Sequence, residues 1–524
     1  MLTTKPAQRA GRREWIALAV LALPTVLLSL DISVLYLALP ELGSGLGASG
    51  TEQLWIMDIY SFMLAGFLVT MGTLGDRIGR RRLLMIGAVA FGLVSVLAAY
   101  ATSPEMLIAA RALLGVAGAT LMPSTMALIR NMFTDPRQMG TAVGVWFACF
   151  VGGMALGPVA GGFLLEHFWW GSVFLLGVPV MLLLLIVGPA LLPEYRDAEA
   201  GRLDLASVAL SLAAILPVIY GLKEPAREGW STTPALALAA GLGCGYAFVR
   251  RQRGLAEPLL DLRLFAGRTF TVALAIMLLG GVVMSGATLM STQYLQLVEG
   301  FSPLNAGLWM LPQNVALVVG SMAGPALARR FRPAHVIALG MALGAAGFAL
   351  HTQIGGTGGL PLLVTGLVLS SAGIAMPMTL TMNLMLAGTP PEKAGSVASI
   401  SETGGEFGVA LGVATMGTLG TVVYRDRLAD TMPNDIPAAS AATARESMAT
   451  ALEAAAGLPA NLTADLLTAA RDAFATGLNA VALVGVAAFV TLGILAATTL
   501  RTTPQPSATD TDTPAEEALV PTAH

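Results

Sequence analysis

The first long apolar run of the chain, Trp15 to Leu39, reads WIALAVLALPTVLLSLDISVLYLAL. As a helix it is long enough to cross about 30 Å of hydrocarbon, and its one acidic residue is Asp31. The run is too long for the apolar core of a signal peptide, and no clear cleavage site follows it. We therefore expect it to stay in the protein as a membrane-spanning helix.

Composition extends this interpretation to the whole chain. Of 524 residues, 55% are hydrophobic and only 12% are charged, which is too little polar surface for a soluble protein of this size. The net charge of −3 gives no reason to expect a nucleic-acid partner. Cys149 and Cys244 lie in separate apolar segments without metal-ligand spacing, so we expect neither a metal nor another cofactor. The fold class is an all-α polytopic membrane protein.

The apolar runs predict fourteen spans. The predicted spans are 15–39, 54–74, 83–101, 105–128, 140–164, 170–192, 205–222, 233–250, 268–294, 303–328, 333–351, 360–387, 394–423 and 477–500. Proline and glycine interrupt spans in both halves, a pattern typical of transporters with a central site.

The positive residues predict the orientation. With the N-terminus inside, cytoplasmic loops carry most of the arginines, and external loops carry only Lys223, Arg227 and four more in one long loop. Both termini are then cytoplasmic. Arginine outnumbers lysine and alanine is abundant, a bias that fits a GC-rich bacterial genome. We therefore expect a multi-pass protein of the bacterial inner membrane.

The long external segment, about 424–476, predicts a helical hairpin. Residues 438–456 are rich in alanine, and a second helical run follows Pro459. The hairpin is either a simple connector or a lid over the external vestibule. The tail, 501–524, is rich in proline, threonine and acids and is predicted to be disordered.

A basic loop joins the second and third spans and reads GTLGDRIGRRRL from Gly72 to Leu83. On its own it is a topology determinant under the positive-inside rule. Its pattern resembles the loop signature of the major facilitator superfamily. The matching residues are Gly72, Asp76, Arg77, Gly79 and Arg80.

Three further segments resemble the motifs of the drug:proton antiporter branch of that superfamily. They are LDISV around Asp31, RALLGVAG from Arg111 to Gly118, and a glycine-rich run in the fifth span. The last run contains Gly153, Gly157, Pro158 and Gly161. The segments around Trp55–Ser61, Glu166–Phe174 and Glu402–Glu406 are similar to quaternary-ammonium and methyl viologen resistance pumps, and the likeness covers nearly the whole chain.

The resemblance implies a fold and a function. The fold would be fourteen helices, with a six-helix bundle at 1–192, two linker helices within 193–267 and a second six-helix bundle at 268–500. The protein would be a proton-coupled antiporter that exports lipophilic cations, including quaternary ammonium compounds, dyes, biguanides and methyl viologen, and it would work as a monomer. Asp31 and the acids of the thirteenth span would take part in protonation and cation recognition. Asp76 and Arg77 would lock the inner gate, and the Gly157-Pro158 pair would bend its helix.

Five Asp, Glu or Arg side chains lie away from the ends of the predicted spans, where charge is costly and functional sites are expected. They are Asp31, Asp58, Arg111, Glu402 and Glu406. Hydrocarbon disfavours a charged carboxylate, so such a group can hold a proton in one conformation and a cation in another. Alternatives remain open: Asp58 could be a solvated helix-end acid, Arg111 could only neutralise Asp31, and the glycines around Glu402 and Glu406 could mark a helix–helix seam.

Aromatic side chains attract delocalised cations, and polar ones could orient them. The candidate substrate contacts are Tyr36, Trp55, Tyr60, Phe62, Trp146, Trp309 and Asn314. The competing interpretation is that they are ordinary core or lipid-facing positions.

Two other functions are alternatives to drug efflux. An exporter of an endogenous lipid or metabolite would use the same fold. A membrane-embedded enzyme would need a catalytic constellation, and the four histidines lie near helix ends or in the tail. We therefore expect a secondary transporter whose partners are small lipophilic cations, protons and the bilayer, and not an enzyme.

Overall fold

The computed structural model describes residues 10–196, 204–228, 231–255, 258, 262–387 and 394–500. Within these ranges the side chains of residues 69, 136–137, 222–223, 225–228, 383, 386–387, 394–396, 398–399 and 402 are not described. The described part is helical and holds no strand, which confirms the all-α prediction. The predicted disordered tail lies outside the described residues.

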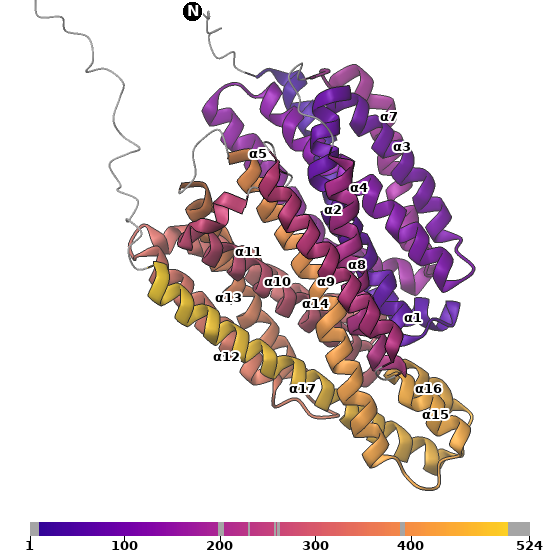
Figure 1. Ribbon diagram of the computed structural model, residues 1–524. Coiled ribbons are helices and arrows are strands. Elements are labelled where there is room, and N and C mark those ends of the chain that lie inside the picture. Colours follow the sequence, from indigo (N-terminus) through magenta and orange to yellow (C-terminus); the bar gives the residue numbers. More distant parts are fainter. Residues whose placement is uncertain are drawn as a thin grey trace, which may run out of the picture.

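The helices form two bundles with a helix pair beside them (Figure 1). The first bundle comprises α1 (Arg12–Leu46), α2 (Gly50–Ile78), α3 (Arg80–Ala99), α4 (Pro104–Met132), α5 (Pro136–His167), α6 (Ser172–Leu175) and α7 (Gly177–Leu191). The pair is α8 (Leu205–Glu228) and α9 (Thr232–Gly254). The second bundle comprises η1 (Leu262–Ala266), α10 (Arg268–Gln293), η2 (Tyr294–Val298), α11 (Pro303–Ala328), α12 (Pro333–His351), α13 (Leu360–Ala387), α14 (Ala394–Thr431) and α17 (Ala460–Thr499).

Every predicted span falls on a helix, but the count of fourteen is not confirmed. Twelve described helices are long and apolar enough to cross a membrane, and α2 makes a thirteenth if its two bent parts are one span. The remaining candidate, α8, has a shorter apolar stretch, Leu205–Gly221. Fourteen spans therefore stay a prediction that depends on α8.

Local sequence signals explain where several helices begin. Ser49 caps α2 with Glu52 in a capping box, and Ser103 and Ser302 accept hydrogen bonds from backbone N–H groups in the first turns of α4 and α11. Proline follows each of the latter two serines, where its missing N–H costs nothing. These three helix starts lie at the same end of the bundle.

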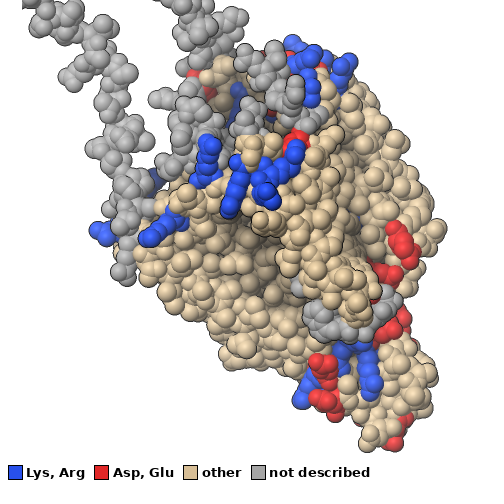
Figure 2. Space-filling view, viewed as in Figure 1, with Lys and Arg blue, Asp and Glu red and all other residues tan. Residues whose placement is uncertain are grey.

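That end also carries a hairpin of two short helices, α15 (Ala438–Glu446) and α16 (Met448–Ala456), between α14 and α17. We call this end of the bundle the hairpin face. The opposite end, where the N-terminus lies, is the N-terminal face (Figure 1). Lysine and arginine side chains gather near the N-terminal face (Figure 2).

The hairpin is packed onto the bundles. The Tyr424 hydroxyl donates to the Ala444 carbonyl at 2.8 Å, and α16 contacts both α1 and η2. Ala444, Met448 and Ala451 are almost completely buried. The hairpin is therefore a folded element that touches both halves.

The two bundles meet through α1, α2 and α5 on one side and α10, α11 and α14 on the other. Near the hairpin face Gln296 donates to the Leu37 carbonyl at 3.1 Å. A side chain at Gly162 would collide with the backbone of Leu304, so α5 and α11 approach closely there. The halves are thus joined toward the hairpin face.

The α8–α9 pair lies against the seam between the halves. α8 contacts α2 of the first bundle and α14 of the second, while α9 packs mainly on α8. α8 therefore lies beside the parts of α2 and α14 that meet at the seam.

Candidate functional site

An ion pair between Asp31 of α1 and Arg111 of α4 lies inside the first bundle. Asp31 Oδ2 is 2.6 Å from Arg111 Nη1, and the two side chains are 10% and 1% exposed. Both residues come from the segments whose motifs resemble drug:proton antiporters. In this conformation Arg111 therefore neutralises the charge of Asp31, as the structural alternative proposed.

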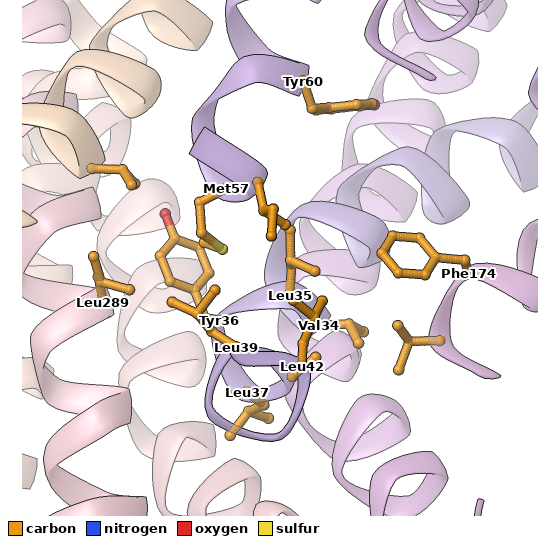
Figure 3. Close-up of a cluster of buried hydrophobic side chains, with 14 of the residues drawn as sticks. Val34, Leu35, Tyr36, Leu37, Leu39, Leu42, Met57, Tyr60, Phe174 and Leu289 are labelled. Carbon is orange, nitrogen blue, oxygen red and sulfur yellow. The ribbon is translucent and has the colours of Figure 1, made fainter. Parts of the chain in front are cut away.

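Further contacts fix the guanidinium of Arg111. Its Nε donates to the Ile56 carbonyl at 3.2 Å, and its Cζ lies 4.4 Å from the centre of the Tyr60 ring and 6.0 Å from that of Phe174. A cation over aromatic faces in a dry site is stabilised electrostatically. Figure 3 shows Tyr60 and Phe174 in the surrounding apolar cluster.

A small cavity opens beside this ion pair at the seam of the two bundles. Its volume is about 10 Å³, room for the centre of one water molecule. Tyr36, Asp58, Ser61 and Arg111 line it from the first bundle, and Val409 and two neighbours on α14 line it from the second. Figure 3 shows Tyr36 beside Met57, another residue of the lining.

Glu406 lies on α14 one turn before Val409 and Ala410, which line this cavity. It is 9% exposed, the Ser61 hydroxyl interacts with its carboxyl group, and its Oε2 atom has no hydrogen-bond partner among the described residues. Tyr36 and Tyr60 lie within electrostatic range of the same carboxyl group. The side chain of Glu402, the other predicted acid of this helix, lies outside the described residues.

Asp58 is 1% exposed, so it is not a solvated acid at the end of its helix. It lies one turn before Ser61 on α2, and both line the cavity. Four of the five predicted ionisable residues are therefore gathered around one seam, three on the first bundle and Glu406 on the second.

The glycine-rich run of α5 is a helix–helix contact. Side chains at Gly153, Gly157 and Gly161 would collide with Ser29, Ser33 and Val34 of α1, respectively. The run continues across the seam, since a side chain at Gly307 of α11 would collide with the Pro158 carbonyl. These glycines hold α1, and with it Asp31, close to α5.

The basic loop has its own ion pair at the N-terminal face. Arg80 Nη2, at the start of α3, lies 2.6 Å from Oδ1 of Asp76, four residues earlier in α2, whereas Arg77 is exposed. Gly79 joins α2 to α3 with φ +113°, which favours glycine. A side chain at Gly72 would make only an ordinary van der Waals contact with Pro123.

The predicted substrate contacts separate into two groups. Tyr36, Tyr60, Phe62 and Trp55 lie at or beside the seam. Trp146 instead donates to the Thr125 hydroxyl at 3.3 Å within the first bundle, and Trp309 is 42% exposed and stacks on Phe301.

Asn314 donates to the Ala155 carbonyl across the α5–α11 contact at 3.3 Å, so in this conformation it joins the two bundles.

Two residues with clear positions were missed by sequence reasoning. Gln296 also joins the bundles, and no local signal marks it. Ser61 could have been found, because its spacing from Asp58 places both on one helix face.

A buried carboxyl group with an open oxygen, at the junction of two helical bundles, can exchange a proton for an organic cation without a catalytic centre. The two-bundle fold with this site defines a multi-span membrane transporter and not an enzyme.

The chain belongs to the major facilitator superfamily, whose family model matches residues 21–413. It is 42% identical over 481 residues to the multidrug efflux pump LfrA of Mycolicibacterium smegmatis, covering 92% of this chain and 95% of that protein. It is 36% identical over 478 residues to the methyl viologen resistance protein SmvA of Salmonella typhimurium, covering 88% and 93%.

Among solved structures, the fold is similar to an inward-facing bacterial homologue of the human lysosomal transporter Spinster. The TM-score is 0.65 at 15% identity, with 93% of this chain and 98% of that chain covered. That likeness concerns the fold alone.

Proposed function

We propose that this protein is a proton-coupled multidrug efflux antiporter that exports lipophilic cations from the bacterial cytoplasm. The observation that carries the proposal is the position of Glu406, a buried acid of the second bundle beside Ser61 of the first. The names of two similar proteins, a multidrug efflux pump and a methyl viologen resistance protein, support the substrate class.

The coupling follows from competition for one carboxyl group. A cation that docks beside Glu406 stabilises the ionised form and expels the proton. A proton that arrives from the other side of the membrane then neutralises the carboxylate and releases the cation. Since both occupants use the same oxygen atoms, exchange needs no separate coupling device.

Asp31 has a different part in this proposal. Because its charge is balanced by Arg111 at 2.6 Å, Asp31 itself adds little negative charge to the cavity beside the pair. A proton can then pass between Asp31 and the cavity only if the pair loosens, which would occur when α1 and α4 shift during the conformational change.

The energetics permit steep gradients. One charge that moves through 100 mV is worth about 2.3 kcal/mol, and one pH unit is worth about 1.4 kcal/mol per proton. When two protons enter for each monovalent cation that leaves, one net charge crosses the potential and two protons cross the pH difference, which together provide about 5 kcal/mol. That energy is enough for a cation concentration gradient on the order of a thousandfold.

The orientation is part of the proposal. We infer that the N-terminal face is cytoplasmic, because lysines and arginines gather there (Figure 2). The hairpin face is then external, and the contacts between halves near it close the outer side. This arrangement would leave the site to be reached from the cytoplasm or the bilayer.

The test uses everted membrane vesicles energised with a proton gradient, to which ethidium or a quaternary ammonium compound is added. We expect each cation to release protons from the vesicles, and Glu406→Gln to reduce the release. A proton signal with a cell-envelope lipid, and with no lipophilic cation, would instead identify an exporter of endogenous lipids.

A further inference from the structure

The seam between α2 and α14 has two sides. One side is the cavity, and on the other α8 packs into the seam. Phe62 of α2 and Ile219 of α8 are 0% and 1% exposed, and they form one cluster with Ala410 and Ala414 of α14. Phe407 packs against this cluster, with its ring 5.9 Å from that of Phe62.

The cavity and the α8 contact lie back to back. Ser61 lines the cavity, and Phe62, the next residue, packs against α8. Glu406 and Phe407 are adjacent in the same way on α14, and Ala410 belongs to both the cavity lining and the α8 cluster. Ala410 therefore lies between the cavity and the residues of α8 in this cluster.

The polar contacts described for α8 hold it to α9. Arg251 Nη2 lies 2.9 Å from Asp204 Oδ1, and Gln252 donates to the Ser207 hydroxyl at 2.6 Å. The described contacts of α8 with the seam are apolar. Within a bilayer, apolar contacts between helices exchange for lipid contacts at little cost, because lipid tails are equally apolar.

The cavity must widen before it can hold an organic cation, since about 10 Å³ admits only one water molecule. Lipophilic cations concentrate in the bilayer, and we expect the α8–α9 pair to separate the seam from it, because α9 packs mainly on α8 and is largely exposed. We propose that the α8–α9 pair is a lateral lid, which moves off the α2–α14 seam and admits lipophilic cations from the bilayer to the cavity beside Ser61 and Glu406. The inference rests on the proposed function and adds the route of entry.

The test locks α8 onto the seam with a disulfide. A side chain at Gly66 of α2 would have its Cβ 3.4 Å from the Cγ of Leu212 on α8, so cysteines at these two positions are close enough to pair. The double variant Gly66→Cys/Leu212→Cys is made in a Cys149→Ala/Cys244→Ala background. Everted vesicles are assayed oxidised and reduced, with tetraphenylphosphonium as the lipophilic cation and methyl viologen as the water-soluble one.

We expect oxidation to lower the initial rate of tetraphenylphosphonium transport at least about tenfold, with recovery on reduction. Methyl viologen transport should stay within about twofold, because this cation reaches the site from water. The matched control is Ala214→Cys/Gly245→Cys, which joins α8 to α9 across a Cβ–Cβ distance of 3.7 Å and leaves the seam free. Its oxidation should change neither rate.

Full tetraphenylphosphonium transport by the oxidised seam variant would overturn the lid. If oxidation stopped the transport of both cations, the lid would also be overturned. The disulfide would then block the motion of the two bundles and not only the entry of cations from the bilayer. Reduced protein that transports neither cation would contradict the proposed function itself.

A second variant tests the lid if the double variant Gly66→Cys/Leu212→Cys does not fold. Ile219→Ala removes part of the side chain that fills the seam. We expect it to raise the tetraphenylphosphonium rate relative to the methyl viologen rate at low substrate concentration. An unchanged ratio would contradict the lid.

Discussion

Asp31 of α1 and Arg111 of α4 form an ion pair of 2.6 Å within the first bundle, next to a cavity that opens on the seam with the second. The pair is almost completely buried, and Tyr60 covers the guanidinium at 4.4 Å. Removing one partner leaves the other charge buried and unbalanced, whereas removing both does not. This relationship decides how substitutions at Asp31 must be interpreted.

We expect Asp31→Asn to abolish cation export and to destabilise the protein, because Arg111 loses its counter-charge. The cost of breaking a buried pair is about 3–5 kcal/mol. The double variant Asp31→Asn/Arg111→Gln should recover much of the thermal stability in detergent without recovering export. Export by Asp31→Asn at wild-type expression, measured as the minimum inhibitory concentration of a quaternary ammonium compound, would rule out a role for this carboxylate.

We expect Glu406→Gln to remove the pH dependence of transport and to weaken export of divalent cations more than that of monovalent ones. A neutral amide cannot exchange a proton for a cation, and it gives a second positive charge no partner. The measurement is the initial rate of methyl viologen and ethidium transport between pH 6 and 8. Glu299→Gln is the control, because Glu299 is not among the residues that line the cavity. Its carboxylate accepts a hydrogen bond from the Tyr294 hydroxyl. An unchanged pH profile in Glu406→Gln would count against competition at this site.

The glycines of α5 provide a test of packing. A Cβ at Gly153 would lie 2.5 Å from the Val26 carbonyl of α1, whereas a Cβ at Gly152 has nothing within 4 Å. We expect Gly153→Ala to destabilise the protein by about 1–3 kcal/mol and to lower transport, because α1 must move away. Gly152→Ala should be neutral or slightly stabilising. Thermal unfolding in detergent compares the two, and equal losses would show that the α1–α5 contact is not what matters.

The contact between Gln296 and the Leu37 carbonyl joins the halves near the hairpin face. Gln296→Leu removes a hydrogen bond worth about 0.5–1.5 kcal/mol and should shift the population toward forms open at that face. The measurement is the rate at which an impermeant maleimide labels a cysteine at position 37 from outside.

The control for that experiment is Gln353→Leu. Gln353 donates to the Ala349 carbonyl one turn earlier in the same segment, so it joins no separate elements. Slower or unchanged labelling in Gln296→Leu would mean that this bond does not hold the outer side closed.

Sequence alone determined the class of fold and the positions of the helices. In hydrocarbon a backbone must satisfy its own hydrogen bonds, so apolar runs such as Trp15–Leu39 can only be helices. Ser103 and Ser302, each followed by proline, marked helix starts for an equally local reason. The cost of charge in hydrocarbon singled out Asp31, Asp58 and Glu406 from the apolar segments around them.

Only the tertiary structure decided which of these groups meet. Asp31 and Arg111 are 80 positions apart, and Ser61 and Glu406 belong to different bundles, so no local pattern encodes their contact. The same holds for α8, whose short apolar stretch does not define its place, whereas the cluster that joins Phe62 and Ile219 does. Helix formation depends on bonds between near neighbours, whereas the site depends on packing between helices remote in the chain.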